Sequence, residues 1–201
     1  MIALIDYGVG NLRSVSKALL AAGAEVVQTD DPKIISSALK VVLPGVGAFQ
    51  DGMQGLKHRE LIPVLKTVVE NGTPLLGICL GMQLFFENSS ERGHTAGLGL
   101  VEGSVEKFKA DRLKIPQTGW NQIQIRQDSP LFHGVISQAY VYFNHSFYCR
   151  PSNPENILAE TDYGQDYASA VQKGNLYGVQ FHPEKSQRVG VKILQNFVQR
   201  C

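Results

Sequence analysis

Residues 77–81 of the chain read Gly-Ile-Cys-Leu-Gly, so that one thiol, Cys79, has a glycine two residues away on each side. This spacing matches the G-x-S-x-G nucleophile elbow, with cysteine in place of serine. At such an elbow a strand turns sharply into a helix, and the side chain at the tip lies at the helix N-terminus, where a thiolate is favoured. The spacing predicts a nucleophile at Cys79 and an oxyanion donor in the backbone N–H of Leu80. On these five residues alone, a thiol that only packs in the core is an equally good interpretation.

A base and its orienting carboxylate are predicted at His182 and Glu184, which follow an apolar run at 176–181. In an extended chain, residues two positions apart lie on the same side. Glu184 can then bond one ring nitrogen of His182 while the other nitrogen faces the thiol, as in a catalytic triad. Taken alone, the pair is also compatible with a solvated surface position. Because the elbow and this pair each supply what the other lacks, together they predict a triad of Cys79, His182 and Glu184.

Two glycine segments follow apolar runs. Gly45, Val46 and Gly47 can turn backbone N–H groups towards a ligand and supply the second oxyanion donor, although a plain strand-to-helix turn is the alternative. The G-x-G at 8–10 lacks the third glycine of a dinucleotide fingerprint, since Arg13 stands in its place. We therefore expect no nucleotide and no other cofactor.

Composition gives an ordinary globular chain of 201 residues, expected to form one domain over 1–201. Its 19 basic and 18 acidic residues give no electrostatic case for nucleic acid or for a membrane surface. No segment approaches the ~20 apolar residues of a membrane span. The three cysteines form no CxxC pair and no metal-ligand spacing, so no metal is expected. An odd cysteine count and an N-terminus unlike a secretory signal favour the cytoplasm.

The order of elements predicts an α/β fold. In the first half, short apolar runs alternate with helical spacing, which is typical of a parallel sheet covered by helices on both faces. In the second half, extended aromatic segments and a hairpin signal at Gly174 and Asn175 predict antiparallel strands that extend this sheet. The apolar runs lie at 2–5, 25–28, 40–43 and 74–78, helices are expected at 12–20, 61–70, 80–86 and around 189–197, and the extended segments lie at 120–125, 140–148, 168–172 and 176–181.

Three ordered motifs resemble the class I, or triad, glutamine amidotransferases. They are Pro-Gly-Val-Gly at 44–47, Gly-Ile-Cys-Leu-Gly-Met-Gln at 77–83 and Gln-Phe-His-Pro-Glu at 180–184. The resemblance implies a flavodoxin-like three-layer fold with a central, mostly parallel sheet. It also implies an enzyme that hydrolyses glutamine to glutamate and passes ammonia to a synthase.

Further segments resemble the glutaminase subunits of imidazole glycerol phosphate synthases, among them Asp-Tyr-Gly-Val-Gly-Asn at 6–11 and His-Pro-Glu-Lys-Ser at 182–186. This likeness implies a heterodimer with a (β/α)8-barrel cyclase, which receives the ammonia and makes imidazole glycerol phosphate and aminoimidazole carboxamide ribotide in histidine biosynthesis. One departure is Ile-Pro-Gln-Thr at 115–118, where relatives often carry Pro-His-Met. By the same likeness, Gln83, Glu91, His145 and Ser146 hold glutamine, and Asn11, Trp120, Tyr142 and Lys185 face the cyclase.

Two other functions remain open at this point. The chain is also compatible with the amidotransferase subunit of another synthase, such as anthranilate synthase, or with a catalytically silent flavodoxin-like module. The resemblance further implies that the isolated chain is a poor glutaminase, and that the orientation of the 44–47 backbone is the switch.

Overall fold

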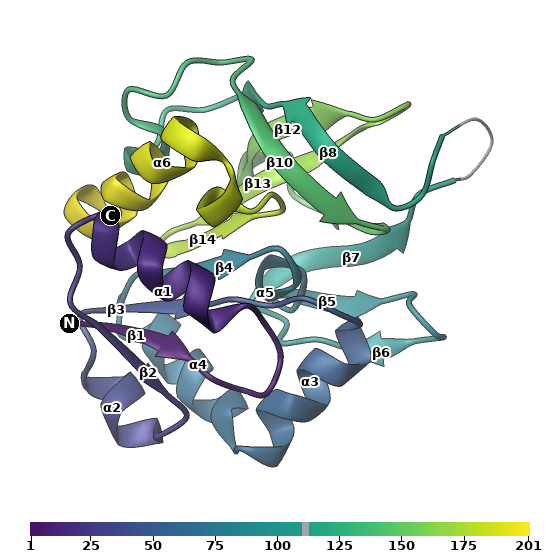
Figure 1. The fold of residues 1–201 in the computed structure, drawn as a ribbon. Helices are drawn as coiled ribbons and strands as arrows, with labels where there is room; N and C mark the ends of the chain where they lie inside the picture. The colour runs from purple at the N-terminus through teal and green to yellow at the C-terminus, as the bar shows by residue number, and fades with distance from the viewer. Residues whose placement is uncertain (110–112) are drawn as a thin grey trace.

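The computed structural model describes residues 1–109 and 113–201, which form a layered α/β structure around a mixed sheet (Figure 1). Strands and helices alternate in the first part: β1 (Ile2–Ile5), α1 (Leu12–Ala21), β2 (Val26–Thr29), α2 (Pro32–Ser37), β3 (Lys40–Leu43), α3 (Phe49–His58), α4 (Leu61–Glu70), β4 (Leu75–Ile78) and α5 (Leu80–Gln83). Strands dominate the second part: β5 (Phe86–Ser89), β6 (Thr95–Ala96), β7 (Val101–Lys107), β8 (Gln117–Gln122), β9 (Gln124–Ile125), β10 (Tyr140–His145), β11 (Phe147–Pro151), β12 (Ile157–Asp162), β13 (Asp166–Lys173) and β14 (Leu176–Val179), before α6 (Gln187–Arg200).

The central sheet is parallel at its β2 end and becomes mainly antiparallel beyond β14, with one further parallel pair between β7 and β5. Its strand order is β2-β1-β3-β4-β14-β13-β11-β7-β5-β6, with β12 beside β13 and β9 beside β12. The strands from β2 to β14 pair in parallel, whereas β13 pairs with both β14 and β11 in antiparallel fashion. The predicted mostly parallel sheet with an antiparallel extension is therefore confirmed.

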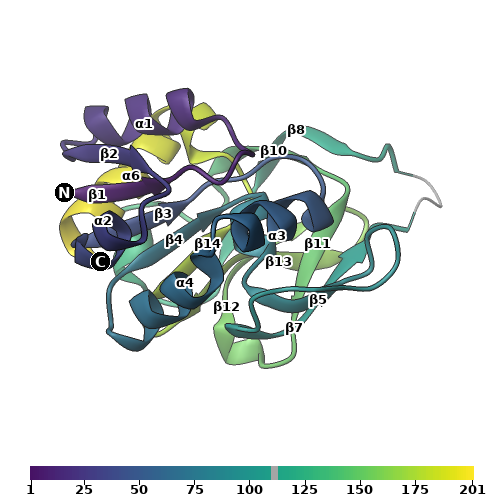
Figure 2. The same cartoon turned by 90° about the horizontal axis from the view of Figure 1, so that it is seen from below.

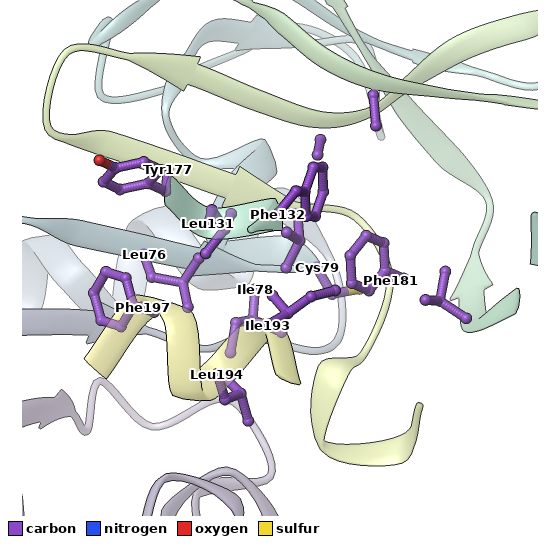
Figure 3. Packing of buried hydrophobic residues seen from close by; sticks show 14 of the residues in the cluster. Leu76, Ile78, Cys79, Leu131, Phe132, Tyr177, Phe181, Ile193, Leu194 and Phe197 are labelled. Carbon is purple, nitrogen blue, oxygen red and sulfur yellow. The ribbon is translucent and has the colours of Figure 1, made fainter. Parts of the chain in front are cut away.

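Helices cover both faces of the parallel strands, as expected (Figures 1 and 2). Alternate residues of β1 show the division: Leu4 belongs to one buried core with Phe197 of α6, while Ile5 belongs to the other core with Leu65 of α4. α1 and α6 cover the first face, and α2, α3 and α4 cover the second. Side chains of α6 pack against those of β4 just below the elbow at Cys79 (Figure 3). None of the described helices is both long enough and apolar enough to span a membrane.

Local signals placed several elements correctly. The Asn11 side chain accepts a hydrogen bond from the Ser14 N–H and caps α1, as a residue of its type at that position predicts. α4 and β3 have the predicted bounds. The β13–β14 hairpin turns at Gly174, whose φ of 58° lies in the left-handed region that glycine favours.

The predicted helix over 80–86 is wrong in its second half. α5 ends at Gln83, and Phe86 begins β5, which pairs with β7. Residues 82–86 are all buried, so the apolar run carries no amphipathic period that distinguishes a helix from a strand.

The predicted extension of the sheet by 120–125 and 140–148 is partly wrong. β8 and β10 pair with each other as a separate two-stranded sheet, whereas β9 and β11 join the large sheet. Val141 and Phe143 of β10 are fully buried in the same core as α6. The ribbon thus packs an apolar face on the core instead of adding strands to the large sheet.

The elbow between β4 and α5 depends on two close approaches. Cys79 has φ 54° and ψ −108°, a conformation that L residues rarely adopt, and its N–H donates to Val179 O at 2.8 Å. A Cβ on Gly81 would overlap the carbonyl oxygen of Leu43, and one on Gly77 would come within 2.6 Å of the Phe85 ring. The two glycines therefore let strand and helix approach as the sequence predicted.

We expect Gly81→Ala to lower the free energy of unfolding by about 3 kcal/mol, because the overlapping atom is backbone and cannot move aside cheaply. Urea unfolding measures this loss. Gly99→Ala is the control, since Gly99 has φ 65° but no atom within 4 Å of an added Cβ, and it should lose about 1 kcal/mol from backbone strain alone. Equal losses in the two variants would contradict the packing argument.

Candidate active site

His182 and Glu184 form a buried pair. Nδ1 of His182 lies 2.8 Å from Oε1 of Glu184, and the two side chains are 3% and 2% exposed. His182 is extended, and its N–H donates to the Tyr142 carbonyl at 2.9 Å. The Ser186 hydroxyl donates to the His182 carbonyl at 2.6 Å. The edge of β10 therefore holds the backbone of the base in place.

The imidazole of His182 is set up to carry a proton beside Cys79. Burial alone lowers the pKa of His182, but hydrogen bonds to Cys79 and Glu184, and the negative charge of both, outweigh it and raise that pKa to about 10. Because Nδ1 is bonded to the carboxylate, Nε2 is left for the sulfur. The structure thus brings the three predicted triad residues together, with a histidine that favours the imidazolium.

A cavity of about 220 Å³ opens over Cys79. Every residue predicted to hold glutamine lines it, together with Val46, Gly47 and Leu80 of the predicted oxyanion elements. Sequence reasoning missed three further lining residues. Asn144 and Phe147 flank the predicted His145 and Ser146, whereas Pro116 lies in the segment 115–118 that departs from the family pattern. The predicted substrate residues that line the cavity are Gln83, Glu91, His145 and Ser146.

Two of these residues, Gln83 and Glu91, already make hydrogen bonds within the chain. Gln83 Nε2 donates to Phe147 O at 3.0 Å and to Gln180 Oε1 at 3.1 Å. Glu91 Oε2 accepts from the N–H of Phe49 at 2.7 Å, which places a carboxylate at the N-terminus of α3. Binding of a substrate carboxylate by Gln83 therefore requires the amide to exchange a partner, and one oxygen of Glu91 is committed to the fold.

His145 is buried and neutral. Its Nδ1 lies 2.8 Å from Phe147 O, so Nδ1 carries the proton and Nε2, 3.3 Å from the Tyr167 hydroxyl, does not. Burial lowers the pKa of His145 to about 4; the hydrogen bond to Phe147 O opposes this shift, and the nearby charge of His182 adds to it. His145 thus lines the cavity as an uncharged polar side chain.

The predicted oxyanion hole is not formed in this conformation. The Leu80 N–H, the expected donor, donates instead to Gly45 O at 3.3 Å. The preceding peptide is fixed, because the buried Tyr7 hydroxyl donates to Pro44 O at 2.6 Å. Gly47 has φ 104° and Val46 is 41% exposed, so the loop continues towards solvent. The role of Tyr7 was not foreseen, since its partner lies 37 residues away.

Three of the four predicted interface residues lie together at the surface, with Trp120 and Lys185 exposed and Tyr142 half-buried. Trp120 and Tyr142 face each other across β8 and β10 with ring centroids 6.1 Å apart, and Lys185 Nζ lies 5.6 Å from the Tyr142 ring. Trp120 is 46% exposed, which is unusual for so large an apolar side chain. Asn11, the fourth, is exposed, and its side chain caps α1.

The chain matches known proteins over nearly its whole length. A model of the family described as glutamine amidotransferase class-I matches residues 3–201. The imidazole glycerol phosphate synthase subunit HisH of Moorella thermoacetica is 49% identical over 98% of this chain and 93% of its own length. The protein of the same name from Methanosarcina mazei is 48% identical over 100% of this chain and 98% of its own length.

A solved structure described as a glutamine amidotransferase superposes with a TM-score of 0.75 at 17% identity and covers 94% of both chains. This likeness shows the fold, which agrees with the predicted three-layer arrangement. The family match and the near-full-length relatives decide membership. The chain belongs to the class I glutamine amidotransferase family.

Proposed function

We propose that this chain is the glutaminase subunit of an imidazole glycerol phosphate synthase and serves histidine biosynthesis. The observation that carries the proposal is that Cys79 lines a cavity together with the residues predicted to hold glutamine, and has the buried His182–Glu184 pair beside it. Relatives that are 48–49% identical over nearly the full length bear the name of that subunit. We further propose that residues 1–201 act as one amidotransferase domain in the cytoplasm.

In the proposed reaction, the Cys79 thiolate attacks the side-chain amide carbon of glutamine, and the carbonyl electron pair moves onto oxygen. His182 gives its proton to the amide nitrogen, the C–N bond breaks, and ammonia leaves a thioester on Cys79. Water then gives a proton to His182 and attacks the thioester. Collapse of this second tetrahedral species releases glutamate and restores the thiolate.

Rotation of one peptide in the loop at 44–47 would form the oxyanion hole. Tyr7 fixes the Pro44 carbonyl, so rotation is confined to the next peptide, which carries Gly45 O and the Val46 N–H. Turning that peptide removes Gly45 O from the Leu80 N–H and brings the Val46 N–H round in its place. Two backbone donors are then available for the oxyanion.

The partner that we propose is a (β/α)8-barrel cyclase docked on Trp120, Tyr142 and Lys185. An aromatic pair at the surface with a neighbouring cation is typical of an interface anchor. The Tyr142 carbonyl also accepts from the N–H of His182. A partner that packs on Tyr142 therefore acts one hydrogen bond away from the catalytic base, and ammonia released there passes to the cyclase.

Cys79→Ala tests the chemistry. It removes the only group that forms the thioester, so we expect glutamine-dependent synthesis by the complex to fall to background. Ammonia-dependent synthesis should continue, because the cyclase does not need the thiol. Assays of cyclised product with glutamine or with an ammonium salt measure both. Loss of both activities in a correctly assembled complex would argue against the proposal.

Partner addition tests the switch. The isolated chain should hydrolyse glutamine slowly, because the Leu80 N–H is engaged by Gly45; a missing oxyanion donor typically lowers the rate ~10²–10³-fold. Adding the barrel cyclase with its nucleotide should raise turnover by a factor in that range, measured as glutamate released. The synthase partner of anthranilate synthase is the control and should have no effect. High turnover without any partner would refute the switch.

Glu184→Gln should move the alkaline limb of glutaminase activity to lower pH. His182 must be protonated to release ammonia, and the Glu184 charge helps hold the pKa of His182 near 10. Below that value the proton is present and above it the proton is lost, so removing the charge brings the loss to lower pH. We also expect a turnover about 10²-fold lower. Steady-state rates of the complex across pH measure both effects; an unmoved alkaline limb would contradict the assigned role.

A further inference from the structure

Two buried amides connect the nucleophile to a backbone carbonyl of the cavity wall. Gln180 Nε2 lies 3.7 Å from Cys79 Sγ, within hydrogen-bond reach of a sulfur acceptor. Gln180 Oε1 accepts from Gln83 Nε2 at 3.1 Å, and the same nitrogen donates to Phe147 O at 3.0 Å. Gln180 is fully buried and Gln83 is 5% exposed. The triad mechanism uses neither bond of Gln180.

Phe147 O sets the direction of this chain of amides. A carbonyl oxygen only accepts, so the amide group of Gln83 that faces it must be the NH₂. Because that nitrogen also faces Gln180, the Gln180 amide must meet it with its oxygen. The NH₂ of Gln180 is then left to face the sulfur. Nδ1 of His145 donates to the same carbonyl at 2.8 Å, so this one acceptor fixes three side chains.

We propose that Gln180 is a further catalytic residue, whose amide N–H donates to the Cys79 sulfur and stabilises negative charge on it, and whose orientation is fixed by Phe147 O through Gln83. An N–H donor stabilises a negative sulfur more than a neutral thiol, because hydrogen bonds to charged acceptors are stronger. Gln180 also stands two residues before His182, so one extended segment brings two donors to the same atom.

Gln180 differs from His182 in what it does with its proton. In the proposed reaction His182 gives its proton to ammonia and later takes one from water, while an amide keeps its hydrogens throughout. The sulfur therefore meets a donor both when it attacks and when it leaves the thioester. The inference rests on the proposed glutaminase activity only for what the sulfur attacks, since the state of the sulfur can be measured without glutamine.

Alkylation of Cys79 by iodoacetamide across pH tests the inference on the full chain. The modified peptide is quantified by mass spectrometry, so that reaction at Cys149 or Cys201 does not interfere. Gln180→Met keeps the side chain's length and removes the donor. We expect alkylation of Cys79 at pH 7 to slow about threefold, because loss of the donor disfavours the reactive thiolate more than it raises the nucleophilicity of that thiolate.

Gln172→Met is the matched control. Gln172 lies on β13, half-buried, and its Oε1 accepts from the Ser129 hydroxyl at 2.7 Å, so the same exchange removes amide bonds that do not involve the sulfur. Its alkylation profile should equal that of the parent. A Gln180→Met profile that superimposes on the parent, with native circular dichroism, would overturn the inference.

Two further variants distinguish loss of the Gln180 N–H donor from a change in side-chain packing. Gln180→Glu keeps the acceptor for Gln83 and places an oxygen at the sulfur, so alkylation near pH 7 should slow at least as much as in Gln180→Met; a parental rate would contradict the donor role even if Gln180→Met fails to fold. Gln83→Met should slow alkylation less than Gln180→Met does. The double variant should be no slower than Gln180→Met, because the two amides act in series; additive effects would refute the orienting role of Gln83.

The outcomes also separate this inference from the proposed glutaminase function. A shifted alkylation profile in a chain that hydrolyses no glutamine with any partner would leave the donor role intact and reject the function. A parental alkylation profile in Gln180→Met, with normal glutamine-dependent synthesis in the complex, would reject the donor role and leave the proposed function intact.

Discussion

The contact of Gly81 with the Leu43 carbonyl is the constraint on which the site depends. Because no side chain intervenes, α5 begins directly against the end of β3, and the chain has room for one residue between β4 and the helix. That residue is Cys79, held at φ 54°. Such a conformation costs about 1–3 kcal/mol and persists only where surrounding structure enforces it. The packing of α6 on β4 and the bond from the Cys79 N–H to Val179 O supply that enforcement.

The base is positioned from a different part of the molecule. β8 and β10 lie on the core as a ribbon, and the edge of β10 pairs with the segment that carries His182 and Ser186. The nucleophile thus belongs to the rigid parallel sheet and the base to its junction with the ribbon. Trp120 and Tyr142 lie on the same ribbon, so the surface proposed to bind the partner is built on the element that holds the His182 backbone.

Local signals made most of the sheet predictable, together with the grouping of Cys79, His182 and Glu184. The elbow is encoded in five consecutive residues, and His182 and Glu184 are two positions apart, so no distant partner was needed to identify them. The helix expected over 80–86 failed because a fully buried run has no amphipathic period. Gln180 was visible only as part of a motif, because its bond to Gln83 joins residues 97 positions apart and the bond that orients Gln83 spans 64 positions. The engagement of the Leu80 N–H by Gly45 O depends on the orientation of one peptide, which sequence does not specify.

The site therefore has hydrogen-bond donors in place for negative charge on the sulfur but not for negative charge on the substrate oxygen. Negative charge on the Cys79 sulfur is met by two donors, the His182 imidazolium and the buried Gln180 amide. The orientation of that amide is fixed, through Gln83, by the Phe147 carbonyl. Charge on the substrate oxygen has none in place, because the Leu80 N–H is bonded to Gly45 O. The two arrangements differ in their surroundings: the two amides are buried and bonded to each other, whereas the Gly45–Val46 peptide leads into the exposed Val46 and Gly47. Under the proposed switch, a partner that favours the turned peptide would raise the rate and leave the surroundings of Cys79 as they are, so control of turnover would fall on a single peptide beside the cavity.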